Sequence, residues 1–147
     1  MKLGITGTRS GMTPQQSVTL SQLLQQLDGA QLHHGDCVGV DAEVALLAQS
    51  LGYELVCHPP IKPELRAWVQ SDQQREPISY FARNRNIVME CDLLLVVPYQ
   101  SEHQTQGGTW YTHDYALKKG RDVIVIWPDG NMTSHIKSGI DTQHDVP

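Results

Sequence analysis

Short apolar runs without polar alternation are the feature that most constrains the fold of this chain. The segment 93–97 reads Leu-Leu-Leu-Val-Val and the segment 123–126 reads Val-Ile-Val-Ile, so neither has a polar position. A strand of this kind is covered on both faces, as in a parallel sheet that lies between helices. The runs that we predict to be strands are 2–6, 31–34, 54–57, 93–97 and 122–127.

Longer segments with helical periodicity separate these runs, and this alternation indicates an α/β fold. The first segment opens with Thr13 and Gln16 around a proline, the residues of a helix start with a capping box. The third carries Phe81, Arg85 and Met89 at i, i+4 spacing, so we expect these side chains to share the face that packs on the sheet. The predicted helices are 13–27, 41–51, 79–90 and 109–119.

The length of 147 residues suits a single domain. We assign the α/β domain to residues 1–127. Within it, the segment 59–77 contains four prolines and is too long for a simple connection, so we expect a helix-containing flap or insertion over the site. Residues 128–147 form a polar tail without a periodic apolar pattern, which is either loose or ordered by a partner.

The charge balance argues against one class of partner. Eleven Lys and Arg face sixteen Asp and Glu, which gives a formal net charge of −5. No excess of positive charge is present for general nucleic-acid binding. The chain has no run of about 18 apolar residues to span a membrane, and its amino terminus lacks a signal-peptide core. We therefore expect a cytoplasmic protein.

The Cys and His residues do not predict a metal site. Cys37, Cys57 and Cys91 lack CxxC spacing, which disfavours a disulfide framework or a zinc knuckle. His33 and His34 are adjacent on a predicted strand, so their side chains point to opposite faces and cannot both bind one ion without distortion. We expect no metal and no cofactor.

Polar loops that contain glycine follow three of the predicted strands. Their sequences include Gly7-Thr8-Arg9, Gly35-Asp36 and Gly107-Gly108-Thr109. In an open parallel sheet, ligands bind at the edge formed by the carboxyl ends of the strands. Glycine lets the backbone approach an anion, and a helix N-terminus offers free N–H groups, so residues 107–109 fit a phosphate cradle. The alternative is that the two glycines simply make a turn.

Other side chains near these loops complete a candidate ligand site. Arg9 suits forked recognition of a phosphate group. Arg85, on the expected packing face of its helix, needs a partner, which is either a ligand or Asp36. Asp36 either accepts hydrogen bonds from ribose hydroxyls or caps the following helix. The candidates to stack on a base are Trp68, Tyr99 and Trp110.

Four blocks of sequence carry a resemblance to a known family. The blocks are Gly4-Ile5-Thr6-Gly7-Thr8-Arg9, His34-Gly35-Asp36 with Gly39-Val40-Asp41, Ala82-Arg83-Asn84-Arg85-Asn86, and Gly107-Gly108-Thr109. In this order they resemble the SLOG superfamily of Rossmann-like proteins, and within it the DUF2493 (YspA-like) type. The resemblance covers about residues 2–127 and leaves the tail unmatched.

This resemblance implies a three-layer α/β/α domain with five parallel strands in the order 3-2-1-4-5. It also implies a nucleotide or nucleotide-derived ligand between the loops after strands one and four, often in a homodimer. The ligand-binding residues that it assigns are Gly7, Thr8, Arg9, Gly35, Asp36, Arg85, Asn86, Gly107, Gly108 and Thr109.

More distant relatives leave other functions open. LOG-type phosphoribohydrolases cleave the N-glycosidic bond of nucleoside monophosphates, and DprA binds single-stranded DNA. The hydrolase motif has a Glu pair after its Gly-Thr, where this chain has Trp-Tyr-Thr-His, so Asp36, Glu90 or Asp114 would have to substitute. We expect a sensor or accessory protein that binds a small nucleotide. A nucleotide N-glycosidase is the enzyme alternative, and an interaction module or a DprA-like DNA-binding protein is a further one.

Overall fold

The computed structural model describes residues 1–137 of the chain. Its elements are β1 (Lys2–Gly7), α1 (Pro14–Gln26), β2 (Gln31–His34), α2 (Val40–Ser50), β3 (Glu54–Cys57), a 3₁₀ turn (Pro63–Leu65), β4 (Gln73–Gln74), α3 (Tyr80–Glu90), β5 (Leu93–Val97), α4 (Gly108–Lys118), β6 (Asp122–Ile126) and β7 (Met132–His135). All the predicted strands and helices are present, and their ends differ from the prediction by one residue at most. Within residues 1–137, no helix is long and apolar enough to cross a membrane.

The strands form one mostly parallel sheet in the order β4-β3-β2-β1-β5-β6-β7. Its five central strands have the predicted order 3-2-1-4-5, so the predicted α/β fold is confirmed. The sheet has seven strands rather than five, because a short strand is added at each edge. β4 pairs with β3 in parallel, and β7 pairs with β6 in the antiparallel direction.

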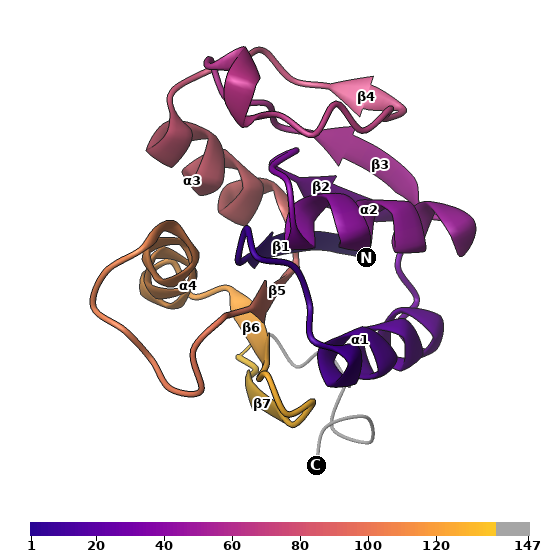
Figure 1. Ribbon diagram of the computed structural model, residues 1–147, viewed down its shortest axis with the longest axis vertical. Helices are drawn as coiled ribbons and strands as arrows, with labels where there is room; N and C mark the ends of the chain where they lie inside the picture. The colour runs from indigo at the N-terminus through magenta and orange to yellow at the C-terminus, as the bar shows by residue number, and fades with distance from the viewer. Residues whose placement is uncertain (138–147) are drawn as a thin grey trace.

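The helices cover both faces of the sheet. α1 and α2 lie on one face, and α3 and α4 lie on the other (Figure 1). β5 shows why its sequence lacks polar alternation. Leu93 and Leu95 join the apolar core under α1 and α2, whereas Leu94 and Val96 join the core under α3 and α4. Successive residues of a strand point to opposite faces, so a strand covered on both sides needs an apolar residue at every position.

The start of α1 is fixed to the carboxyl end of the sheet. Thr13 caps the helix by accepting a hydrogen bond from the Gln16 backbone N–H, and the Gln16 side chain accepts from the Thr13 N–H, as the capping box predicts. The Gln16 amide also donates to the carbonyls of Pro98 and Ile126, at 3.0 Å each. Such caps contribute about 1 kcal/mol, and this one also joins α1 to the ends of β5 and β6.

The face that α3 buries differs from the prediction. Phe81 and Met89 are about half exposed, whereas Arg83 and Asn84 are buried. The expectation that Arg85 lies on the packing face was therefore wrong, because α3 packs through Arg83, Asn84, Ile87 and Val88. A buried guanidinium needs hydrogen-bond acceptors. The carbonyls of Gly35 and His58 accept hydrogen bonds from Arg83, and this allows Arg83 to be buried.

The segment 59–77 and the start of the tail also differ from expectation. The segment contains a 3₁₀ helix of three residues and the short β4 but no α-helix, because its prolines lack the N–H donors that a longer helix needs. It runs over the carboxyl ends of β2 and β3. Within the expected tail, β7 is an ordered edge strand of the sheet. The tail beyond residue 137 lies outside the described residues.

Candidate functional site

A hollow of about 440 Å³ lies at the carboxyl ends of β1 and β5. These strands are neighbours in the sheet but are far apart in the sequence, so their loops diverge and leave a crevice. The residues that line the hollow are Gly7, Thr8, Arg9, Tyr80, Tyr99, Gln100, Gln106, Gly107, Gly108, Thr109 and Trp110.

The N-terminus of α4 forms one wall of this hollow. Gly107 is its N-cap residue, and no side chain caps the helix there. The first N–H groups of a helix have no partner within the helix, and together they carry a partial positive charge. The backbone of Gly107 adopts a φ of +102°, which favours glycine, and nothing lies within 4 Å of the position that a Cβ atom would occupy there. The N-terminus of α4 is therefore accessible to an anion.

Tyr80 packs directly against this helix start. A Cβ atom on Gly108 would collide with the Tyr80 hydroxyl, so glycine is needed there for the close approach. The guanidinium groups of Arg9 and Arg83 lie 5.7 and 4.9 Å from the centroid of the Tyr80 ring. The Tyr80 ring thus contacts both the exposed Arg9 and the buried Arg83.

The lining of the hollow has a positive balance of charge. Arg9 is exposed at the end of β1, and neither Asp nor Glu is among the described residues that line the hollow. Next to it is a second hollow of about 360 Å³, which shares Arg9 and Tyr80 with the first. Pro60, Ile61 and Leu65 give this second hollow an apolar wall, and Lys62 adds a cation. A ligand with a phosphate and a flat apolar part matches the two hollows together.

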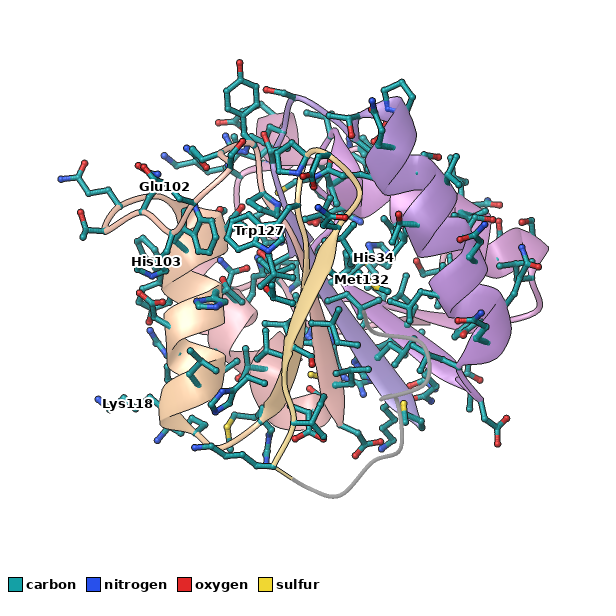
Figure 2. All side chains as sticks on the ribbon, turned by 90° about the horizontal axis from the view of Figure 1, so that it is seen from below. His34, Glu102, His103, Lys118, Trp127 and Met132 are labelled. Atoms are coloured by element: carbon teal, nitrogen blue, oxygen red, sulfur yellow. The ribbon has the colours of Figure 1, made fainter. Side chains whose placement is uncertain are left out.

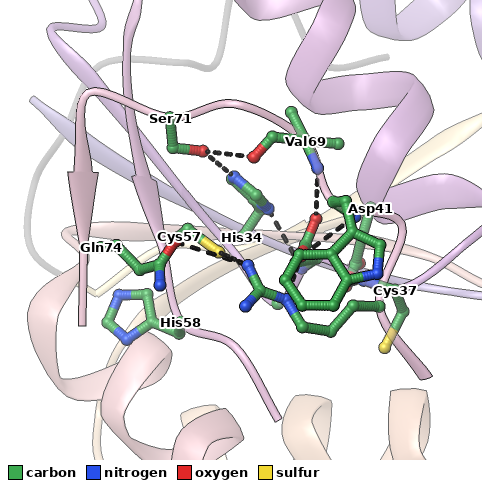
Figure 3. A network of polar contacts seen from close by, with 12 residues as sticks. His34, Cys37, Asp41, Cys57, His58, Val69, Ser71 and Gln74 are labelled. Atoms are coloured by element: carbon green, nitrogen blue, oxygen red, sulfur yellow. Dashed lines mark hydrogen bonds and ion pairs between the residues drawn. The ribbon is translucent and has the colours of Figure 1, made fainter. Parts of the chain in front are cut away.

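The carboxyl end of β2, by contrast, is filled by protein. Asp36 is fully buried, and its carboxylate accepts hydrogen bonds from the Arg66 Nε at 2.7 Å and from the Val69 backbone N–H at 2.8 Å (Figure 3). The Trp68 N–H is 3.3 Å from the same carboxylate. Asp36 thus holds the segment 59–77 in place, and it does not line either hollow.

His34 completes this buried network. The His34 Nδ1 accepts a hydrogen bond from the Asp36 N–H at 3.0 Å, so its Nε2 carries the proton and lies 2.8 Å from the Ser71 hydroxyl (Figure 3). Burial lowers the pKa of His34 to about 4, because the charged imidazole would lose its hydration. Burial raises the pKa of the nearby Asp41 to about 6 for the same reason. The polar groups of His34 and Asp36 are therefore hydrogen-bonded within the protein and stabilise the fold.

The structure brings together six of the ten residues assigned to the ligand. Gly7, Thr8 and Arg9 line the same hollow as Gly107, Gly108 and Thr109. The remaining four lie elsewhere. Gly35 and Asp36 belong to the filled end of β2, and Asn86 is exposed on α3. Arg85 donates a hydrogen bond to the Tyr111 hydroxyl of α4 at 2.9 Å.

Some residues of the hollow carried no signal in the sequence. Tyr80, Gln100 and Gln106 belong to no motif, and only the packing of α3 and of the loop before α4 places them there. Of the aromatic side chains expected to stack on a base, Tyr99 is exposed at the hollow and Trp110 is buried in its wall. Trp68 lies outside it and stacks on the Arg66 guanidinium, with 3.9 Å between the guanidinium carbon and the ring centroid.

Comparisons with known proteins identify the fold. No protein-family model and no curated protein match the sequence. Among solved structures, DNA processing protein A (DprA) from Streptococcus pneumoniae has a TM-score of 0.64 at 19% identity, over 95% of this chain and 52% of that one. This chain thus spans about half the length of that DprA. The molybdenum cofactor carrier protein from Chlamydomonas reinhardtii has a TM-score of 0.62 at 21% identity, over 84% and 74% of the two chains.

A third neighbour corrects one expectation. DprA from Helicobacter pylori, which binds single-stranded DNA, has a TM-score of 0.58 at 21% identity, over 85% of this chain and 64% of that one. The expectation that general nucleic-acid binding is unlikely is therefore wrong, because a protein with a similar Rossmann-like fold binds single-stranded DNA. The local potential around a site, rather than the sum of all charges, determines which polyanions it attracts.

Proposed function

We propose that this protein binds a small nucleotide, or a ligand derived from one, in the hollow between β1 and β5. Its phosphate group accepts hydrogen bonds from the N-terminus of α4 and from Arg9, while its base extends past Tyr80 or Tyr99. The observation that carries the proposal is that Arg9 and the uncapped start of α4 line the same hollow. A helix N-terminus and an arginine together form a common kind of phosphate site.

The size of the site supports this ligand class. Pockets for small molecules commonly have volumes of roughly 300–1,000 Å³, and the hollow of about 440 Å³ falls within that range. The second hollow across Arg9 and Tyr80 has the apolar wall that a base or a second nucleotide unit needs. Thr8 and Thr109 add hydroxyl groups that can bond to a sugar or a phosphate.

The carboxylates favour binding over cleavage of the glycosidic bond. Such a hydrolase needs a group that stabilises the developing positive charge or orients water. The three substitutes that the sequence offers all have other partners. Asp36 pairs with Arg66, Glu90 pairs with Arg75, and Asp114 lies within 2.8 Å of His103 and of His113. None of the three lines the hollow within the described part of the chain.

Calorimetry tests this proposal with nucleoside mono- and diphosphates, cyclic nucleotides, dinucleotides and a short single-stranded DNA. We expect binding of at least one nucleotide, and we expect Arg9→Gln to weaken it by roughly 10- to 100-fold, since a hydrogen bond to a charged group contributes about 1.5–3 kcal/mol. Arg85→Gln is the matched control, because Arg85 donates a hydrogen bond to Tyr111 outside the hollow. The nucleotide affinity of this variant is expected to equal that of the parent.

Two results would contradict the proposal. One is the absence of binding throughout the panel, and the other is an Arg9→Gln affinity equal to that of the parent. A larger loss with Arg85→Gln than with Arg9→Gln would move the phosphate to α3, as the sequence resemblance implies. Release of free base from a nucleoside monophosphate, followed by chromatography, would show that the site is catalytic despite the distribution of its carboxylates.

A further inference from the structure

Three groups of His, Cys, Asp or Glu side chains in residues 1–137 have candidate metal-ligand atoms within 4.8 Å of one another. Two of these groups are already occupied by a guanidinium. Asp36, which lies with His34 and Cys57, pairs with Arg66. Glu90, which lies with His33 and His58, accepts hydrogen bonds from Arg75. A metal cation in either group would be repelled by that arginine, so neither group is a favourable site.

The third group, His103, His113 and Asp114, has a different arrangement. The His103 Nε2 and the His113 Nδ1 each lie 2.8 Å from the same Asp114 Oδ1. The side chains of His103 and Asp114 are 47% and 51% exposed, so an ion can reach them from solvent. Among residues 1–137, no Lys or Arg forms an ion pair with Asp114. Lys118, one turn further along α4, lies toward the other end of the helix from His103 (Figure 2).

We propose that His103, His113 and Asp114 bind a divalent transition-metal ion of the zinc class. Imidazole nitrogens with one carboxylate oxygen are ligands that Zn²⁺, Co²⁺ and Ni²⁺ accept, whereas Mg²⁺ and Ca²⁺ require mostly oxygen ligands. Neighbouring ligand atoms around a tetrahedral zinc ion lie about 3.3 Å apart. The two nitrogens must therefore move slightly away from the Asp114 oxygen, which the exposed carboxylate allows. The fourth position is left for water.

Packing already orients the two imidazole rings. Trp110 is buried, and its ring centroid lies 4.9 Å from that of His103 and 5.2 Å from that of His113. The Trp110 Nε1 in turn donates a hydrogen bond to the Gln100 side chain at 3.1 Å. Holding ligands in place before the ion arrives reduces the entropy lost on binding. Because Trp110 and Gln100 also line the candidate nucleotide hollow, a bound ion would fix one wall of it.

The test is titration of the full chain, without an affinity tag, with Zn²⁺ by calorimetry and with Co²⁺ by visible absorption. We expect one ion per chain. His103→Ala and His113→Ala are each expected to weaken binding by at least about tenfold, since losing even a group that only orients a ligand costs that much. His135→Ala is the matched control, because His135 is an exposed histidine on β7 outside the group, and it should bind like the parent.

Several outcomes would overturn the proposal. They are no Zn²⁺ binding at micromolar concentrations, binding that persists unchanged in His103→Ala, and binding that Glu90→Gln removes instead. His103→Ala truncates a half-exposed side chain, so the variant is expected to fold, and circular dichroism verifies this. The metal titration needs no nucleotide, so its result is independent of whether the nucleotide proposal holds.

Discussion

The carboxyl ends of β1 and β2 lie side by side in the sheet, and both lead into a glycine followed by polar residues, yet only one is open. After β1, Arg9 is exposed at a hollow. After β2, the Gly35 carbonyl and the Asp36 carboxylate are saturated by Arg83 and Arg66. A polar residue at the ligand-binding edge of a parallel sheet therefore has two possible partners, a ligand or another part of the chain.

The segment 59–77 produces this difference. The backbone N–H of Ala67 donates to the Asp36 carbonyl at 2.7 Å, and the backbone N–H of Arg75 donates to the Cys57 carbonyl at 2.8 Å. These bonds hold the segment against β2 and β3. Its first part reaches β1 only at the side of the second hollow, where Ile61 and Lys62 lie near Arg9. The segment thus closes one strand end and forms a side wall for the other.

We expect the greatest loss of stability from Asp36→Asn. The substitution leaves Arg66 buried without a counter-ion, and breaking a buried ion pair costs about 3–5 kcal/mol. Asparagine tolerates the left-handed backbone of Asp36, which has a φ of +57°, so backbone strain does not contribute. Urea unfolding measures the loss. Nucleotide affinity of the folded variant should match that of the parent, because Asp36 does not line the hollow.

A matched ion pair near the surface provides the control for this measurement. The side chains of Arg75 and Glu90 are 40% and 34% exposed and lie 2.7 Å apart. Solvent screens such a pair, so Glu90→Gln is expected to cost about 1 kcal/mol or less. Equal losses in Asp36→Asn and Glu90→Gln would show that the β2 end is not the closed region that we describe. A nucleotide affinity that falls in Asp36→Asn would place Asp36 at the ligand.

The next effect in size is a loss of stability in acid that originates at the β2 end. In the unfolded chain His34 binds its proton near pH 6.5. In the folded protein the pKa of His34 is lowered to about 4, so the proton binds only at a lower pH. The stability that depends on neutral His34 is therefore complete above pH 6.5 and is lost as the pH falls toward 4. At about 1.4 kcal/mol per pKa unit, the loss is of the order of 3 kcal/mol.

The variant His34→Asn isolates this contribution. Asparagine keeps an oxygen that can accept the hydrogen bond from the Asp36 N–H, but it does not titrate. The free energy of unfolding, measured in urea at several pH values, should fall less steeply in the variant than in the parent between pH 6.5 and 4. Asp41 acts in the opposite direction, because its raised pKa makes the protein less stable as the pH rises from about 4 to 6, but both proteins contain it. Parallel curves would rule out His34 as the source.

Most of the fold could be predicted from the sequence because its signals are local. Leu93–Val97 has an apolar residue at every position, which specifies a strand buried on both faces, and Thr13 with Gln16 specifies a helix start. β7 could not be predicted, because its exposed edge carries polar residues and its pairing with β6 depends on tertiary contacts. The face of α3 was misjudged, because a buried arginine looks the same in sequence as an exposed one.

The candidate site could be predicted only in part, for a related reason. That Arg9 and Gly107–Thr109 lie close together could be predicted, because glycine turns after strands converge at one edge of a parallel sheet. Sequence spacing does not reveal that Asp36 is satisfied by Arg66, which lies 30 positions further along the chain. It likewise gives no sign that Tyr80 packs against Gly108. Which polar groups are already paired is a property of packing between distant segments.

A smaller loss than those at Asp36 and His34 is expected from Gly108→Ala, at the wall of the hollow. The new methyl group would collide with the Tyr80 hydroxyl, so Tyr80 must move and the mouth of the hollow changes shape. Such overpacking costs about 1–3 kcal/mol of stability, and the affinity for any bound nucleotide should fall as well.

Gly120→Ala is the control. Gly120 has a positive φ of 70° and nothing within 4 Å of its Cβ position. That variant is therefore destabilised only by backbone strain, at the far end of α4. If Gly108→Ala lost no more stability or affinity than Gly120→Ala, Tyr80 would not be a fixed wall, and the contrast between an open β1 end and a closed β2 end would lose one of its supports.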